Sequence, residues 1–306
     1  MTTLLALDIG GTKIGWGIVE AEDSFTVTER GSIPTLAAQG GANVAARICT
    51  LASELIESHP AIAGIAVASA GVVDPATGTI VSATDIMPGW AGTKLGDLLS
   101  AHTQLPVRVL NDVHAHGLGE ATLGAGRPYR SVLSIAVGTG IGGAFVEDGR
   151  GAFGSRGIAG HVGHVHHHFA PDMVCSCGRL GHIESFCSGS GITTWYNSLR
   201  PQDKPEVDGG RALQELADSG DPLAQACFAR SAYALGEATA SLVNCMDPAV
   251  VIISGSMTRS GDIWWDGLNE GFSASAMTPV ATTPILVGSL GGNAPLLGAV
   301  SFFLNA

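Results

Sequence analysis

The sequence predicts an α/β protein made of two related domains that share a cleft. Its 306 residues are enough for two modest domains. Both halves open alike, with an apolar strand, a glycine turn and a second apolar strand, at residues 4–19 and again at 132–146. Short buried strands then alternate with amphipathic helical patterns. Weak internal duplication of this kind is typical of two α/β domains that face each other.

The first domain is expected to span residues 1–115, with a C-terminal helix at 295–306 packed on it. Apolar residues recur at helical spacing over 41–58 and predict an amphipathic helix there. A later strand ends at Asn111 and Asp112, and functional side chains often lie at such carboxyl ends. The expected elements are strands at 4–7, 14–19 and 25–28, a helix at 41–58, strands at 65–67 and 107–110, and a helix at 114–121.

The second, larger domain is expected to span residues 116–294. An uncharged stretch at 284–304 holds two prolines and a glycine pair, so we predict a strand, a turn and a core helix there rather than a membrane span. The other expected elements are strands at 132–137, 143–146 and 250–253, and long helices between 210 and 246.

Composition and charge exclude several kinds of partner. The chain is 45% hydrophobic and 14% charged, so a large core is expected. Its net charge of −12 argues against a nucleic-acid partner, because phosphate backbones bind Lys and Arg. The N-terminus has no basic segment and no cleavage-site pattern. We therefore expect a cytoplasmic protein with neither a nucleic-acid nor a membrane partner.

Two glycine-rich turns, Asp8–Lys13 and Gly138–Gly143, are of phosphate-binding type. A turn without Cβ atoms lets backbone N–H groups approach a phosphate closely. Asp8 could hold Mg²⁺, and Thr12 and Lys13 could donate to phosphate oxygens. Neither turn matches the Walker pattern or a dinucleotide fingerprint. For either turn alone a glycine hairpin is an equal alternative, but two turns of the same kind favour phosphate binding.

The segment from His161 to Glu184 contains six histidines and two cysteines around one C-x-C. This density of nitrogen and sulfur ligands predicts a small metal site for zinc, with a metal-free His-rich loop as the alternative. The other four cysteines are spread unlike a secreted disulfide framework. They lie in apolar patterns and are expected in the core: Cys49, Cys187, Cys227 and Cys245.

The motifs taken together resemble the ROK family of sugar kinases and related repressors. They are D-I-G-G-T-K, N-D after a strand, G-T-G-I-G-G, G-H, and C-x-C-G-x-x-G-x-x-E, and the resemblance runs from Leu4 to Gly298. It implies an actin-like ATPase (ribonuclease H-like) fold and phosphoryl transfer from ATP, with Mg²⁺, to a hexose or N-acetylhexosamine. It also implies a homodimer. Polyphosphate in place of ATP stays open as the phosphate donor.

The resemblance assigns Asp112 as the catalytic base and Asn111 as a partner of the sugar hydroxyls. One carboxylate on the attacking hydroxyl can take its proton as the new bond forms. The alternative is an N-cap Asp for the following helix, and both roles can hold together. The residues that the resemblance and the two turns assign to ATP are Asp8, Gly10, Gly11, Thr12, Lys13, Gly138, Thr139, Gly140 and Gly255.

The resemblance also supplies a zinc ligand set. It implies His164, Cys175 and Cys177 as ligands, and His182 stands where relatives have a third cysteine. A histidine from 166–168 is the alternative fourth ligand. With four protein ligands the zinc would be structural. It would hold the loop beside the sugar, where the family motif places Glu184 on the sugar hydroxyls.

A second departure concerns His161, where the family motif G-E-x-G-H has glutamate. A neutral imidazole can donate a hydrogen bond, which suits an N-acetyl carbonyl, whereas a carboxylate only accepts. The G-H-x-G-H form is similar to bacterial N-acetylmannosamine kinases. We therefore expect phosphorylation of the 6-hydroxyl of N-acetylmannosamine, with glucokinase or another hexose or hexosamine kinase as the alternative. Further sugar-site candidates are Gly71, Thr84 and Gly142.

Some of these residues and motifs also allow other interpretations. His161 could merely pack under its loop, and Trp90 is expected in the core rather than on a sugar. A repressor would carry an N-terminal helix-turn-helix, but the first core strand begins near residue 4 and the net charge is −12. A sugar-binding protein without catalysis is disfavoured by the presence of Asp8, Asp112 and both glycine turns.

Overall fold

The computed structural model describes residues 2–22 and 24–305. The contacts between residues divide the chain into two compact units. The first comprises Met1–Arg130, Ala144–Gly160 and Ser289–Ala306, and the second comprises Ser131–Gly143 and His161–Gly288. Each is described below by itself. The domain bounds expected from the sequence, at 115 and 294, stay a prediction.

The first unit is built on a sheet in the order β3-β2-β1-β4-β7. Its strands are β1 (Thr2–Ile9), β2 (Lys13–Ala21), β3 (Phe25–Pro34), β4 (Ile62–Ser69) and β7 (Val107–Asn111). Strands β1, β4 and β7 run parallel, with Asp8 opposite Ala68 and Ser69 opposite Asn111. Their carboxyl ends therefore meet at one edge, which is where ligands bind in open α/β sheets. The strands expected from the sequence are confirmed, and β3 is longer than expected.

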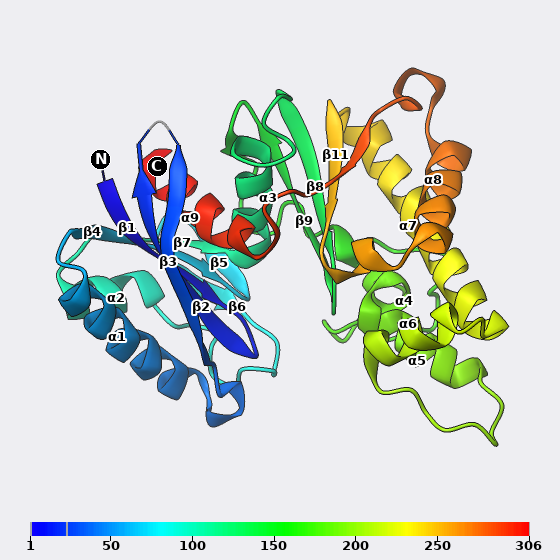
Figure 1. Ribbon diagram of the computed structural model, residues 1–306, viewed down its shortest axis with the longest axis horizontal. Coiled ribbons are helices and arrows are strands. Elements are labelled where there is room, and N and C mark those ends of the chain that lie inside the picture. The colour runs from blue at the N-terminus through cyan, green and yellow to red at the C-terminus, as the bar shows by residue number, and fades with distance from the viewer. Residues whose placement is uncertain (1, 23, 306) are drawn as a thin grey trace. The chain divides into compact units, whose positions relative to one another are not determined.

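Helices cover both faces of this sheet (Figure 1). Helices α1 (Gly41–Ser58) and α2 (Leu95–Thr103) pack together, and α1 has the bounds that its apolar spacing predicted. Because side chains alternate along a strand, Leu5 and Leu7 join the core shared with these helices. Helices α3 (Asp112–Thr122) and α9 (Ala294–Asn305) pack together on the opposite face. A small hairpin, β5 (Val72–Asp74) and β6 (Thr79–Ser82), completes the unit.

Glycines allow α3 and α9 to approach closely. A Cβ at Gly298 would collide with the carbonyl oxygen of Ala115, and one at Gly119 would collide with that of Ala294. Backbone packed on backbone leaves little room for α3 to slide or rotate. Asp112 is the first residue of α3, so this contact helps to fix the position of its carboxylate.

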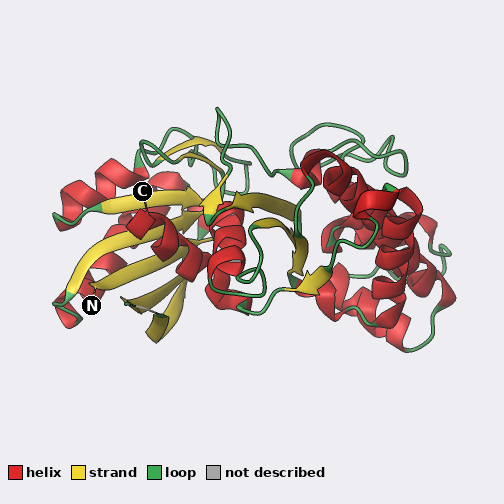
Figure 2. Ribbon diagram, turned by 90° about the horizontal axis from the view of Figure 1, so that it is seen from above, coloured by secondary structure: helices red, strands yellow, loops and turns green. Residues whose placement is uncertain are grey.

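The second unit combines a mixed sheet with a group of helices that gather on one side of its strands (Figure 2). The sheet order is β10-β9-β8-β11-β12, and β8, β11 and β12 run parallel. The unit boundary passes through β9. The strands are β8 (Ser131–Val137), β9 (Ile141–Glu147), β10 (Arg150–Gly151), β11 (Val250–Ser254) and β12 (Ile285–Val287), and the helices are α4 (Glu184–Cys187), α5 (Gly189–Leu199), α6 (Gly209–Asp218), α7 (Pro222–Met246) and α8 (Asp262–Ser275).

The expected elements of this unit are confirmed, with one different strand bound and one different cysteine. Strand β9 starts at Ile141, inside the expected turn, and the cysteine of α7 at position 245 is exposed rather than in the core. Cys49, Cys187 and Cys227 are buried as expected. The stretch at 284–304 forms β12, a turn and most of α9. Within residues 2–22 and 24–305, no helix combines the length and the apolar character needed to span a membrane.

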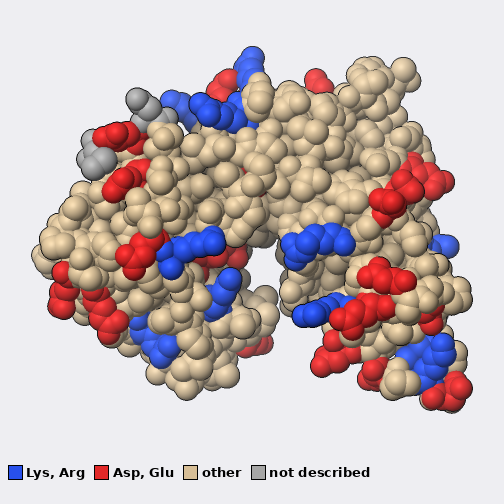
Figure 3. Space-filling model, viewed as in Figure 1, with Lys and Arg blue, Asp and Glu red and all other residues tan. Residues whose placement is uncertain are grey.

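Charged side chains are sparse on the surface. On the face drawn in Figure 3, Lys and Arg lie in separate small groups, several of them beside Asp or Glu, and uncharged residues cover most of the rest. This distribution agrees with the low charged fraction of 14%.

Candidate functional site

The first glycine turn joins β1 to β2 at the carboxyl edge of the first sheet. The N–H of Gly10 donates to the carbonyl of Lys13 at 3.0 Å, and the Thr35 hydroxyl donates to the carbonyl of Gly10 at 2.6 Å. The first bond closes the turn, and the second ties the turn to the segment that follows β3. Thr12 and Lys13 are exposed at its tip. Asp8, the next-to-last residue of β1, is half-buried just before the turn.

The helix cap at the end of β7 is Asn111, so the alternative that Asp112 is the N-cap is wrong. The Asn111 Oδ1 accepts from the N–H groups of Val113 and His114, at 3.1 and 3.0 Å. Its Nδ2 donates to the carbonyl of Gly71 at 2.8 Å and to Asp112 Oδ1 at 2.9 Å. All four hydrogen-bonding positions of this amide are thus used within the first unit. Asn111 positions the Asp112 carboxylate, and its expected contact with sugar hydroxyls stays a prediction.

Two half-buried carboxyl residues, Asp8 and Asp112, lie at this edge, and both are harder to ionise than usual. Burial is the main cause that raises the pKa of Asp8 from 3.8 to about 6, and the negative charge of Asp112 adds to it. The positive charge of Lys13 lowers this pKa in part. Burial likewise raises the pKa of Asp112, while hydrogen bonds from the Val113 N–H and from Asn111 oppose the rise. For Asp8, the folded protein binds a proton more tightly than the unfolded chain. Its ionisation therefore opposes folding, and stability is lost as the pH rises from about 4 to about 6.

Mg²⁺ is the cation expected here, and the residues fit it. A half-buried carboxylate with a raised pKa gains from a cation that restores its lost solvation. Carboxylate oxygens are also the ligands that Mg²⁺ prefers. Asp8 is the residue of this edge that the sequence assigned to the ion.

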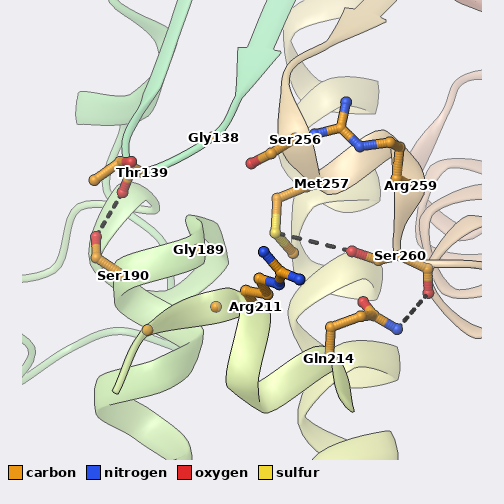
Figure 4. Close-up of a pocket in the computed structure, with 12 residues that line it drawn as sticks. Gly138, Thr139, Gly189, Ser190, Arg211, Gln214, Ser256, Met257, Arg259 and Ser260 are labelled. Atoms are coloured by element: carbon orange, nitrogen blue, oxygen red, sulfur yellow. Dashed lines mark hydrogen bonds between the residues drawn. The ribbon is translucent and has the colours of Figure 1, made fainter. Parts of the chain in front are cut away.

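The second glycine turn forms one wall of a cavity of about 600 Å³ in the second unit (Figure 4). The N–H of Gly138 donates to the carbonyl of Gly140 at 2.9 Å. Ser190, at the start of α5, donates to the carbonyl of Thr139 at 2.5 Å. Figure 4 shows Met257 and Gln214 across the cavity from Thr139. Its size and its glycine-turn wall suit a nucleotide.

Two arginines of this cavity were not predicted from the sequence. Arg211 lies in α6 and Arg259 in the short turn after β11, and both line the cavity. Cations near a phosphate-binding turn favour an anionic ligand. Gly255, expected to contact ATP, does not line the cavity. It has φ of 94°, and a Cβ there would collide with the carbonyl of Val137, so it shapes the path into the lining residues Ser256 and Met257.

The metal-binding residues assigned from the sequence lie together in the second unit. One ligand atom from each of His164, Cys175, Cys177 and His182 lies within 4.8 Å of the others. The distance from His164 Nδ1 to Cys175 Sγ is 3.5 Å, and the distance from His182 Nδ1 to Cys177 Sγ is 3.2 Å. Tetrahedral zinc with bonds of about 2.0–2.3 Å separates its ligands by roughly 3.3–3.8 Å, so this donor set fits zinc.

None of the alternative fourth ligands, residues 166–168, belongs to this group of four. His167 and His168 face Glu237, with nitrogen to oxygen distances of 3.6 and 3.9 Å. His166 pairs with His182 through an isolated backbone bridge. The arrangement therefore favours His182 over residues 166–168 as the partner of the two cysteines.

Glu184 begins α4, directly after this cluster. Its Oε1 accepts from the Ser176 hydroxyl at 2.5 Å, and its Oε2 accepts from the N–H of Ile141 at 2.9 Å. His161 precedes the short turn that carries His164, and the two rings stack with centroids 6.2 Å apart. Gly142 lies in β9, half-buried, next to Ile141.

The remaining sugar-site candidates belong to the first unit. Gly71 has φ of 98°, and a Cβ there would lie 2.7 Å from the carbonyl of Ser82, so glycine is required. Thr84 is exposed in the loop that follows β6. Trp90 is buried, with its Nε1 donating to the carbonyl of Ala70 at 3.2 Å, and belongs to the core as expected.

Comparison with known proteins identifies the fold. A family model described as "ROK family" matches residues 4–306. A glucokinase of Halalkalibacterium halodurans is 30% identical, with 96% of this chain and 92% of that protein covered. An N-acetylmannosamine kinase of Escherichia fergusonii is 30% identical over 97% of both.

Among solved structures, a ROK family glucokinase from Streptomyces griseus in complex with glucose and AMPPNP is 27% identical over 97% of both chains, with a TM-score of 0.81. This likeness confirms the actin-like ATPase fold expected from the sequence. The chain belongs to the ROK family.

Proposed function

We propose that this protein transfers the terminal phosphoryl group of ATP to the 6-hydroxyl of N-acetylmannosamine. The observation that carries the transfer is the Asp112 carboxylate, half-buried at the start of α3 and held there by Asn111 and by the N–H of Val113. A half-buried carboxylate with a raised pKa and a fixed direction is suited to accept a proton from an alcohol. The names of the relatives support a sugar as that alcohol.

Each group then has a separate task. ATP would bind in the cavity lined by Gly138 and Thr139, whose backbone would meet the phosphates. Asp8 would hold Mg²⁺, which when bound neutralises charge on the phosphate oxygens. Asp112 would accept the proton of the attacking hydroxyl as the new O–P bond forms. The other product of the transfer is ADP.

The choice of sugar depends on His161. Its imidazole can donate to the carbonyl of an N-acetyl group, which glucose lacks. Glu184 would accept hydrogen bonds from sugar hydroxyls, and the zinc cluster would keep the neighbouring loop rigid. Zinc would take no part in the chemistry, because four protein ligands would fill its coordination.

Glucose is the second candidate. It is favoured by the glucokinase of H. halodurans and by the S. griseus glucokinase that was crystallised with glucose. The homodimer and the cytoplasmic location expected from the sequence stay predictions.

A substrate panel separates the two sugars. Initial rates with ATP and Mg²⁺ are measured for N-acetylmannosamine, glucose, N-acetylglucosamine and N-acetylgalactosamine. We expect the highest kcat/KM for N-acetylmannosamine, and we expect His161→Glu to shift the ratio of kcat/KM values toward glucose. A higher kcat/KM for glucose with the unaltered protein would overturn the choice of sugar. The absence of turnover with every sugar would overturn the kinase proposal itself.

A further inference from the structure

The Glu184 carboxylate is held from two sides within the second unit. The Ser176 hydroxyl donates to Oε1 at 2.5 Å and the Ile141 N–H donates to Oε2 at 2.9 Å. Ser176 is the middle residue of the C-x-C, and Ile141 lies in the second glycine turn. One carboxylate therefore joins the metal-binding loop to the phosphate-binding turn.

We propose that Ser176 is a positioning residue for the sugar, acting through Glu184. This inference rests on the proposed function, because it assumes that Glu184 contacts the sugar. Two bonds to different oxygens fix both the direction and the rotation of a carboxylate, whereas one bond leaves it free to rotate. Each oxygen keeps a further lone pair for a sugar hydroxyl. Glu184 is only half-buried, and with Ser176 it lines a cavity of about 420 Å³, so a ligand can reach it.

Glycine at position 140 belongs to the same arrangement. A Cβ on Gly140 would lie 2.7 Å from Glu184 Oε2, closer than non-bonded atoms approach. A Cβ at residue 140 would push this oxygen away from the Ile141 N–H, so glycine permits the bond in the geometry observed. Gly140 was assigned to phosphate binding from the sequence, and this contact gives it a second task.

Zinc explains why a serine at position 176 is well placed. If Cys175 and Cys177 are both ligands, the backbone of Ser176 is fixed on each side by a metal bond. Cys175 Sγ also lies 3.5 Å from Glu184 Oε1, but a thiolate bound to zinc has no proton to donate. The Ser176 hydroxyl then remains the donor to this oxygen among the side chains that the structure describes. The metal would thus affect sugar affinity through one hydroxyl.

The test compares Ser176→Ala with Ser176→Thr and with a control, Ser241→Ala. Ser241 is an exposed serine of α7 whose hydroxyl donates to the carbonyl of Glu237 in the same helix. Sugar affinity is measured by calorimetry without nucleotide, with N-acetylmannosamine and glucose as ligands. Zinc content and steady-state kinetics are measured on the same preparations.

We expect Ser176→Ala to raise the Kd and the KM for the sugar about 3- to 10-fold, the range of one hydrogen bond. The KM for ATP and the zinc content should be unchanged, kcat should fall less than the sugar KM rises, and Ser176→Thr should restore affinity. Unchanged sugar affinity in Ser176→Ala would overturn the inference. Loss of zinc from Ser176→Ala would also overturn the inference, because the serine would then be needed for the folding of the metal-binding loop.

Calorimetry keeps this inference separate from the proposed function. A protein that binds a sugar without phosphorylating it would contradict the kinase proposal, yet the comparison of Ser176→Ala with the unaltered chain would still decide the role of the serine.

Discussion

Replacing Asp112 by asparagine is expected to lower kcat by roughly 10²- to 10⁴-fold, the usual contribution of a general base. An amide has nearly the shape of the carboxylate but cannot take the proton of the hydroxyl. The KM for the sugar should change much less, because the hydrogen bonds that hold position 112 come from the Asn111 side chain and the Val113 N–H. Steady-state assays with ATP and Mg²⁺ give both constants.

The same variant also tests the fold. Burial raises the pKa of Asp112, so its ionised form destabilises the native state at neutral pH. Asp112→Asn should therefore melt at the same temperature as the unaltered protein or higher at pH 8. Asp97→Asn is a matched control, since Asp97 is an exposed aspartate in the first turn of α2. A kcat within a few-fold of normal in Asp112→Asn would refute the role of the base.

Removing a zinc ligand is expected to have the second large effect. Cys177→Ala leaves three of the four donors, and we expect loss of bound zinc, a lower Tm and at least a 10-fold higher KM for the sugar. Structural zinc sites contribute directly to folding free energy, about 10–16 kcal/mol in isolated zinc-finger peptides. The KM for ATP should change less, because no zinc ligand lines the nucleotide cavity among the residues described.

Two further variants complete this test. Cys245→Ala is the control, because Cys245 is also exposed but has no part in the cluster. His182→Cys should keep one zinc per chain, since a thiolate is an equally good ligand in a tetrahedral site. Metal content is read by mass spectrometry and stability by thermal unfolding. Full zinc content in Cys177→Ala, or no zinc in the unaltered protein, would contradict the assignment.

The elements that the sequence predicted are those with a strong local pattern. The helix at 41–58 was found with its bounds because its apolar residues repeat at helical spacing. Helices α2 and α8 were not predicted. They begin after Lys94 and Gly261, neither of which makes a side-chain cap, so the usual start signal is missing. The hairpin of β5 and β6 was missed because strands of three and four residues are too short for a period to show.

The same distinction applies to the site. Cysteines and histidines at ligand spacing could be recognised in the sequence, and the fold brings His164 and His182 to Cys175 and Cys177. Arg211 and Arg259 could not be recognised, because an exposed arginine has no local pattern and only the tertiary fold brings both into the cavity that Gly138 also lines. The helix cap was misassigned by one residue, since asparagine and aspartate cap equally well and stand side by side.

The bond formed in the reaction is the most direct test of the central claim. The product of the unaltered protein with ATP, Mg²⁺ and N-acetylmannosamine is examined by phosphorus–proton correlation NMR. We predict one phosphomonoester signal coupled to the two protons on C6. A phosphate coupled to the proton on C1, or no phosphorylated sugar from any member of the panel, would contradict the account.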